Sequence, residues 1–352
     1  MLETRTSSPA IDGANYKEVD SNMLPLLEVR DLVKYFPVYS RGIFRKKIVG
    51  NVHAVDRISF TVNERETVGL VGESGCGKTT TGKLILYLEK PSSGQILFNG
   101  KDVVQTFSKG SKEEQLKLRR SMQMVFQNPY ASLDPRMTVY DIISEPFKIH
   151  RHVPSNEWKD RVYKLLEMVG LEPYHAERYP HEFSGGQRQR ICIARALAVE
   201  PRFIIADEPV SSLDVSIRAQ ILNLIMELQE KLGMSYLYIS HDLSSVRQIS
   251  QRVIVMYLGE IVEQAPTAKL FDNPVHPYTR ALMSAVPIPD PKRKMNVIIL
   301  PGEVPSPINP PPGCRFHPRC QYADQKCKEE KPSFSQVDVD HFVSCHYWHK
   351  FV

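Results

Sequence analysis

A glycine-rich turn between an apolar segment and a helical one constrains this chain more than any other feature. Residues 72–79 read Gly-Glu-Ser-Gly-Cys-Gly-Lys-Thr and fit the pattern G-x-x-x-x-G-K-[ST] at every fixed position. The glycines let backbone N–H groups curl around phosphate oxygens, and a following helix presents its positive N-terminal end to them. Because a strand is expected at 66–71 and a helix at 79–88, the turn predicts a nucleotide-binding α/β domain.

Individual positions of this turn suggest individual roles. Lys78 is expected to reach the β- and γ-phosphates of ATP, and the Thr79 hydroxyl to hold Mg²⁺. The other positions of the turn expected to contact ATP are Gly72, Ser74, Gly75, Cys76, Gly77 and Thr80. Cys76 stands at a free position of the pattern, where a tolerated small side chain is favoured over a redox role. The alternative, an accidental match, is disfavoured by the flanking strand and helix.

Two adjacent carboxylates follow a second apolar segment. Phe203–Asp207 is short and apolar, as in a buried parallel strand, and Glu208 comes next. A carboxylate at such a strand end lies beside the phosphate loop in a doubly wound sheet. We expect Asp207 to hold Mg²⁺ through its water shell and Glu208 to act as general base. His241, after the apolar strand 235–239, is expected to contact the γ-phosphate and hold Glu208 in register; solvated charge and a structural histidine are the alternatives.

A third motif opens a predicted helix. Residues 183–190 read Phe-Ser-Gly-Gly-Gln-Arg-Gln-Arg, which resembles the signature of ATP-binding cassette (ABC) proteins, with Phe183 where many members have leucine. In that family this serine and these glycines close over the γ-phosphate held by the other subunit. The resemblance therefore implies an ATP site shared between two chains. It assigns contact with ATP to Ser184, Gly185, Gly186 and Gln187.

The same resemblance places further elements of the site. Gln127 is similar to the glutamine that touches Mg²⁺ or the attacking water and senses the membrane partner. Asp214 ends a stretch, 211–214, that resembles the loop crossing between subunits. Phe36, or failing it Tyr35, is similar to the aromatic residue that stacks on adenine. These assignments complete the set of expected ATP and Mg²⁺ contacts.

The resemblance also implies an architecture. We expect an α/β P-loop NTPase cassette at 25–265: a RecA-like, mostly parallel core sheet with an antiparallel β subdomain and a helical insert at about 128–195. A polar tail, 1–24, precedes it, and a small cysteine-bearing extension, 266–352, follows. The chain has one cassette and no sustained heptads, unlike translation-factor and chromosome-type members. Transport is therefore favoured over an ATPase that acts on nucleic acid or ribosomes.

Composition agrees with an ATPase that reaches the membrane through partners. No apolar run approaches the roughly 20 residues that a spanning helix needs. The net charge is +5, and the basic residues are scattered instead of forming the patch typical of nucleic-acid binders. We therefore expect no nucleic-acid partner and a place at the cytoplasmic face of a membrane.

Three further stretches give a finer resemblance. Residues 127–136, 276–282 and 313–320 resemble the oligopeptide/dipeptide importer ATPases. This family imports peptides, although relatives carry nickel or oligosaccharides. The resemblance implies two membrane permease subunits, an extracellular substrate-binding protein and a heterodimer with a second, related ATPase.

Four cysteines crowd the end of the chain with the spacing C-x5-C-x6-C-x17-C. They are Cys314, Cys320, Cys327 and Cys345. Four thiolates suit tetrahedral zinc or an iron–sulfur cluster, and the spacing lacks the close C-x-x-C pairs of zinc knuckles. The resemblance favours a [4Fe-4S] cluster with a structural role. Zinc, with help from nearby histidines, and free buried thiols are the alternatives.

Overall fold

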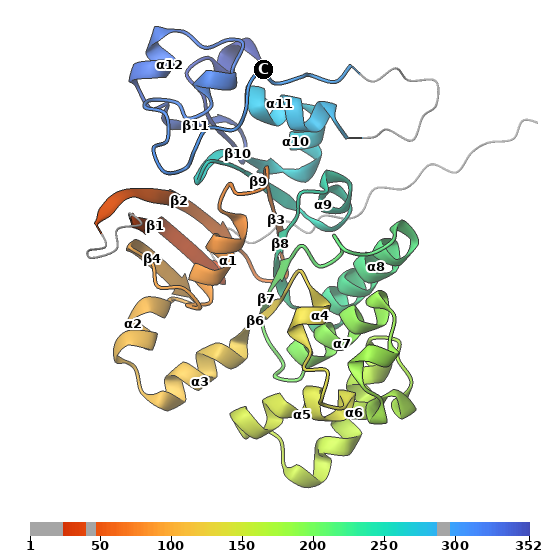
Figure 1. Ribbon diagram of the computed structural model, residues 1–352. Coiled ribbons are helices and arrows are strands. Elements are labelled where there is room, and N and C mark those ends of the chain that lie inside the picture. The colour runs from red at the N-terminus through yellow and green to blue at the C-terminus, as the bar shows by residue number, and fades with distance from the viewer. Residues whose placement is uncertain (1–23, 40–46, 287–295) are drawn as a thin grey trace, which may run out of the picture.

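The structure is a computed structural model that describes residues 24–39, 47–286 and 296–352. The polar tail expected at 1–24 lies almost wholly outside the described residues. Two sheets and several groups of helices make up the molecule (Figure 1). Within the described ranges, no helix is both long and apolar enough to cross a bilayer.

An eight-stranded sheet forms the centre, in the order β11-β12-β10-β9-β3-β8-β7-β6. Its last five strands in this order are parallel to one another. They are β9 (Arg252–Tyr257), β3 (Thr67–Val71), β8 (Ser235–Ile239), β7 (Phe203–Asp207) and β6 (Met122–Val125). Every residue of β3, β7 and β8 is buried, which explains why these segments are short and apolar throughout.

A separate antiparallel sheet has the order β2-β1-β4-β5. Its strands are β1 (Leu27–Tyr39), β2 (Ile48–Val62), β4 (Ser93–Phe98) and β5 (Lys101–Asp102). Apolar and polar residues alternate only over 26–33 and 54–62, so this pattern by itself predicts shorter strands than those observed. The pairing of β1 with β2 continues beyond the alternating part, with irregular register. This is the antiparallel β subdomain expected at the N-terminal side.

Helices cover the sheet and form the insert. α1 (Lys78–Ile85), α8 (Val215–Leu232) and α9 (Leu243–Ile249) belong to the core. The other helices of the first 200 residues are α2 (Val103–Lys109), α3 (Lys112–Ser121), α4 (Pro129–Ser132), α5 (Val139–His150), α6 (Trp158–Met168) and α7 (Gly185–Leu197). α5 and α6 lie at the opposite end of the molecule from the C-terminal region (Figure 1).

The C-terminal region continues the central sheet. β10 (Glu260–Pro266) pairs with β12 (His341–Ser344), which pairs with β11 (Phe334–Asp338). Its helices are α10 (Thr267–Asp272), α11 (Pro277–Ser284) and α12 (Gln325–Glu329). Short 3-10 helices span Ser155–Glu157, Pro173–Glu177, Pro180–Glu182, His317–Arg319 and Trp348–Lys350. The last residues are therefore joined to the cassette by backbone hydrogen bonds across a sheet.

Candidate functional site

The glycine-rich turn joins the end of β3 to the start of α1, as the sequence predicted. Gly72 and Gly77 have φ angles of 149° and 109°, which side-chain-bearing residues rarely adopt. A Cβ atom would lie 2.2 Å from the Met256 carbonyl oxygen at Gly72, and 2.1 Å from the Ala54 carbonyl oxygen at Gly77. Only glycine fits at these two positions, because the backbone passes directly against other backbone.

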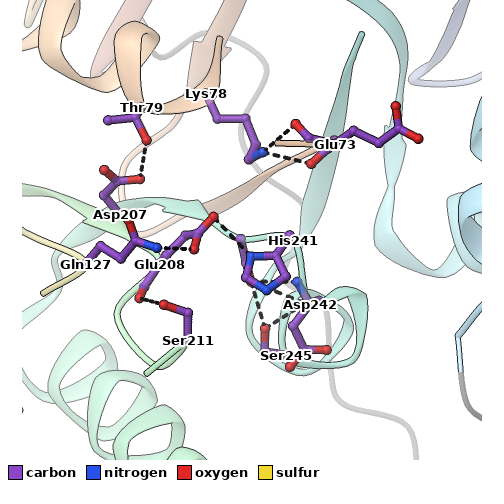
Figure 2. Close-up of polar contacts among 12 residues, drawn as sticks. Glu73, Lys78, Thr79, Gln127, Asp207, Glu208, Ser211, His241, Asp242 and Ser245 are labelled. Carbon is purple, nitrogen blue, oxygen red and sulfur yellow. Dashed lines mark hydrogen bonds and ion pairs between the residues drawn. The ribbon is translucent and has the colours of Figure 1, made fainter. Parts of the chain in front are cut away.

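The start of α1 presents several groups that suit a phosphate. The Lys78 ammonium is buried and donates hydrogen bonds to the carbonyl oxygens of Gly72 (2.7 Å) and Glu73 (3.0 Å), as Figure 2 shows in part. The N-cap residue, Gly77, offers no side-chain cap to the first N–H groups of the helix. Uncapped N–H groups and the helix dipole together favour an anion at this end.

A pair of oxygen atoms suits Mg²⁺ beside this helix start. The Thr79 hydroxyl donates a 2.9 Å hydrogen bond to Oδ1 of Asp207, at the end of β7. Burial is the main cause that raises the pKa of Asp207, against the hydrogen bond from Thr79, and the charge of Glu208 adds to the rise. A hard cation beside Asp207 would offset the cost of burying its negative charge, and magnesium prefers carboxylate and hydroxyl oxygens. The residues present therefore fit the ion that the sequence predicted.

Glu208 lies in a row with the two other predicted catalytic residues. Its carboxylate accepts a 2.7 Å hydrogen bond from Nε2 of Gln127 and lies 3.0 Å from Nδ1 of His241 (Figure 2). The three residues follow β6, β7 and β8, which are neighbouring parallel strands, so their ends meet at one edge of the sheet. The row can orient a water molecule and take its proton.

The backbone at Glu208 adopts a conformation that is unfavourable for a residue with a side chain. Its φ angle is 47°, in the left-handed region, which costs about 1–3 kcal/mol unless the surroundings impose it. The Glu208 N–H donates to the Ile239 carbonyl oxygen (2.9 Å), and the Ser211 hydroxyl donates to the Glu208 carbonyl oxygen (3.1 Å). These bonds turn the carboxylate away from that of Asp207 and toward Gln127 and His241.

Half of the predicted ATP-binding residues face one cavity of about 700 Å³, a size suited to a nucleotide. It is lined by Phe36, Val52, Ala54, Ser74, Gly75, Gly77, Lys78, Thr79, Thr80, Gln127, Glu208 and His241. Tyr35, the alternative adenine contact, instead donates a hydrogen bond to Asp56 (2.8 Å) and packs against His53. The structure therefore places Phe36 at the cavity and Tyr35 away from it.

Gly72 and Cys76 support this cavity from behind without lining it. The Cys76 side chain is buried, with its sulfur 3.8 Å from Nζ of Lys78. Burial raises the pKa of this thiol, against the effect of Lys78. The cysteine is therefore a neutral packing residue beneath the turn, in keeping with the favoured interpretation of its sequence position.

The signature residues lie elsewhere in the chain's structure. Ser184 caps α7: its Oγ accepts from the N–H of Gln187 (3.3 Å), and the Gln187 side chain accepts from the N–H of Ser184 (3.0 Å). This reciprocal cap explains why the helix begins at Gly185. Asp214 stands at the start of α8 without a side-chain cap bond. The four signature residues and Asp214 are absent from the lining of the nucleotide cavity.

Comparisons with known proteins agree with this geometry. A family model described as ABC transporter matches residues 55–211, and one described as oligopeptide/dipeptide transporter, C-terminal region, matches 262–327. The oligopeptide transport ATP-binding protein AppF of Bacillus subtilis is 54% identical over 330 residues, 93% of this chain and 98% of the relative. The dipeptide transport ATP-binding protein DppF of Haemophilus influenzae is 47% identical over 93% of this chain and 98% of the relative. The chain belongs to the ATP-binding subunits of the oligopeptide/dipeptide ABC transporter family.

Solved structures confirm the cassette fold. The chain resembles cbiO1 from Clostridium perfringens, part of the ABC transporter complex cbiONQ, with a TM-score of 0.59 and 30% identity over 70% of this chain and 91% of that one. It also resembles the ATP-binding cassette MJ0796, solved as a dimer bound to ADP and Pi, with a TM-score of 0.58 and 26% identity over 68% and 98% of the two chains. This ABC subunit is a P-loop ATPase whose hydrolysis of ATP is coupled to transport.

The four late cysteines of this ABC subunit line a second, small cavity together with His276, Phe316, His317, Tyr322 and His346, among others. Burial is the largest cause that raises the pKa of all four thiols, to about 12 for Cys314 and about 11 for Cys345. In the part of the chain that is described, no group of three or more His, Cys, Asp or Glu side chains is arranged to hold a metal ion. The residues are gathered, as neutral thiols, and the predicted cluster stays a prediction.

Sequence reasoning missed the contacts that the C-terminal region makes with the phosphate loop. The Tyr278 hydroxyl accepts from the N–H of Glu73 (2.9 Å), and Arg319 forms an ion pair with the Glu73 carboxylate (2.8 Å). Both residues lie in the stretches 276–282 and 313–320, which the finer resemblance had singled out. Their presence there was the available signal, but nothing in the sequence indicates that Glu73 is the partner.

Proposed function

We propose that this chain powers an ABC importer for di- or oligopeptides. The observation that carries the proposal is the division of the site: one cavity collects the phosphate loop, the oxygen pair of Thr79 and Asp207, and the row around Glu208, whereas the signature lies outside it. Each chain thus carries one half of an ATP site at the phosphate loop and the other half at the signature. Two such chains arranged head to tail would complete both sites. ATP binding then stabilises the closed pair more than the open one.

Each side chain has a distinct role in this proposal. Phe36 stacks on adenine, and Lys78 with the N–H groups of the loop binds the phosphates. Thr79, Asp207 and Gln127 hold Mg²⁺, which would neutralise charge on the phosphates. Glu208 takes the proton of the attacking water, while His241 and Gln127 fix the direction of its carboxylate.

The partner cassette supplies the remaining contacts. We propose that Ser184, Gly185, Gly186 and Gln187 of one chain close over the γ-phosphate bound to the other, with Asp214 at the crossing loop. We further propose that the partner is a second, related ATPase, so that the pair is a heterodimer. Native mass spectrometry of the complex purified from its host tests this: two different ATPase masses are expected, and a complex with two copies of this chain would contradict it.

A groove beside α5 supports contact with membrane subunits. It has a volume of about 290 Å³ and an apolar lining that includes Phe107, Met124, Phe126 and Ile149. Phe126 and Ile149 are 38% and 55% exposed, and Phe126 precedes Gln127 directly. A helix docked here would therefore touch the chain one residue from the proposed catalytic row. We propose that the two membrane permeases of the transporter dock through this groove. The chain then works at the cytoplasmic face of the membrane, and an extracellular binding protein delivers the substrate.

The peptide substrate is proposed from the C-terminal match and from what the relatives are named for. The test is reconstitution of this chain with its permeases, second ATPase and binding protein in proteoliposomes. Short peptides should stimulate ATP hydrolysis, whereas Ni²⁺ and oligosaccharides should not. Stimulation by nickel or by a sugar would reassign the substrate. Stimulation by DNA or RNA, with no permease in a mild-detergent pull-down, would favour a non-transport ATPase.

We propose a [4Fe-4S] cluster for Cys314, Cys320, Cys327 and Cys345, within a C-terminal domain at 266–352 that follows the cassette at 25–265. The shared cavity of the four thiols supports the proposal, and such a group would bind them as thiolates and staple the segments that carry them. Anaerobic purification followed by iron and sulfide analysis tests it. Colourless protein with one zinc ion per chain would favour zinc. Protein that contains no metal would favour the remaining alternative, free buried thiols.

A further inference from the structure

Glu73 is contacted from both sides of the phosphate loop. Its carbonyl oxygen accepts from Lys78, its N–H donates to the Tyr278 hydroxyl, and its carboxylate pairs with Nη1 of Arg319 at 2.8 Å. The Tyr278 ring is fully buried, and the Arg319 side chain is only 9% exposed. Figure 2 shows Glu73 next to the ammonium of Lys78. One residue therefore connects the proposed phosphate-binding lysine with two side chains of the C-terminal region.

The loop is also supported from beneath by a turn that the C-terminal region holds. The Cys76 carbonyl oxygen accepts from the N–H of Gly259 (2.9 Å), and the Gly259 carbonyl oxygen accepts from the N–H of Asp56 (2.8 Å). Arg315 binds the same turn, because its guanidinium donates to the Leu258 carbonyl oxygen and forms ion pairs with Asp56 and Glu260. Movement of Arg315 would therefore be transmitted through this turn to Cys76, in the second half of the phosphate loop.

Charge gives the contact at Glu73 a specific consequence. A carboxylate within the loop repels the phosphates that the loop is proposed to bind, and this repulsion is strong where water is scarce. Arg319 neutralises the carboxylate and draws it away from the loop's N–H groups. Loss of the arginine would leave an unpaired negative charge on the phosphate loop, at the residue next to Ser74, which lines the nucleotide cavity. Loss of the Tyr278 hydroxyl would leave the Glu73 N–H without a hydrogen-bond acceptor. This favours rotation of the peptide group that carries the N–H.

We propose that Arg319 and Tyr278 are positioning residues for nucleotide binding, acting through Glu73. The proposal rests on the proposed role of the loop around Lys78 in binding phosphate. Arg315 and Arg319 are the sequence neighbours of Cys314 and Cys320. The cysteine-lined cavity is therefore connected to the nucleotide cavity through two arginines, and any displacement of residues 314–320 lowers the affinity for ATP.

Titration of the full-length protein with Mg²⁺ and a fluorescent ATP analogue tests the proposal. Arg319→Ala should raise the Kd about tenfold, within the usual range for coupling between sites. Arg319→Lys, which keeps the charge, should recover part of the loss. Tyr278→Phe should show a smaller rise. In steady-state hydrolysis, Arg319→Ala should raise KM more than it lowers kcat. Lys328→Ala, an exposed cation on α12, is the matched control and should bind as the wild type does.

The decisive variant is the double substitution Glu73→Gln with Arg319→Ala. If Arg319 acts by neutralising Glu73, the double variant should bind the analogue about as tightly as Glu73→Gln alone. A loss of affinity that persists in the Glu73→Gln background would mean that Arg319 supports the fold only, and would overturn the proposal. Wild-type affinity in Arg319→Ala would overturn it as well.

Wild-type affinity in Lys78→Ala would instead reject the proposed role of the phosphate loop itself. Tyr278→Phe and Arg319→Lys carry the test if Arg319→Ala does not fold.

Discussion

The nucleotide cavity and the cysteine-lined cavity are built in opposite ways. The first takes its polar groups from one short turn and from three neighbouring strand ends, and two of its polar side chains, Glu208 and His241, are partly open to solvent. The second draws on segments between His276 and Phe351, and its thiols, one buried and three half-buried, lie among aromatic rings. The first depends on local backbone geometry and can be recognised in a sequence. The second depends on how distant segments pack, and it needs the cassette beneath it.

The largest effect that can separate the two regions is expected at Glu208. Glu208→Gln should leave nucleotide binding intact and slow hydrolysis by about 10²- to 10⁴-fold, because the amide keeps the shape but cannot take a proton. Single-turnover hydrolysis by the assembled transporter measures this, with nucleotide affinity measured in parallel. Glu230→Gln, an exposed carboxylate on α8, is the control. Near-normal turnover in Glu208→Gln would remove the residue from the mechanism.

The next effect is expected where the two regions meet. Arg315 is 8% exposed and pairs with Asp56 and Glu260, so Arg315→Ala removes a buried cation from two carboxylates that keep only Tyr35, His53 and Lys331 as partners. Removing one member of a buried ion pair costs about 3–5 kcal/mol of folding free energy. Urea unfolding monitored by circular dichroism measures the change, with Lys328→Ala for comparison. A cost below about 1 kcal/mol would mean that the two regions are held together by apolar packing and the sheet alone.

Asp56 gives the same junction a dependence on pH. Although burial acts to raise the pKa of Asp56, hydrogen bonding from Tyr35 and the charge of Arg315 hold it below the ordinary value of 3.8. The folded protein thus binds fewer protons at Asp56 than the unfolded chain does. The stability that the carboxylate contributes is fully present above pH 3.8 and is lost as the pH falls through the lower pKa of the folded state.

Asp56→Asn keeps a carbonyl oxygen for only one of the two donors, Tyr35 at Oδ1 or Arg315 at Oδ2, and has no charge to lose. At pH 7 the variant should be about 2 kcal/mol less stable than the wild type, as for hydrogen bonds to a charged group. This difference should shrink as the pH falls below 3.8, because the wild-type carboxylate becomes protonated first in the unfolded chain and then, at lower pH, in the folded protein. Thermal unfolding of both proteins between pH 7 and pH 3 measures it. A difference that stays constant over this range would mean that shape, and not charge, makes the contribution of Asp56.

The two regions also differ in how far the sequence could predict them. The turn at 72–79, the strand end at Asp207 and the capped start of α7 were predictable, because each depends on residues a few positions apart. Phe36 was preferred to Tyr35 by resemblance to the family, because no local pattern specifies which face of β1 meets the cavity. The pairing of Arg319 with Glu73 joins residues 246 positions apart. No local pattern specifies such a partner, and the same holds for the sheet that joins β10 to β12.

The smallest effect is expected at an ion pair with similar chemistry to that of Arg315. Arg30 and Glu28 form two short hydrogen bonds, at 2.6 and 2.8 Å, but the Arg30 side chain is 55% exposed. Water solvates both charges well in the unfolded chain and nearly as well in the folded one, so Arg30→Ala should leave the free energy of unfolding unchanged within the error of the measurement. Urea unfolding beside Arg315→Ala gives the comparison directly. Equal costs for the two variants would mean that burial does not distinguish the junction with the C-terminal region from the surface of the antiparallel sheet.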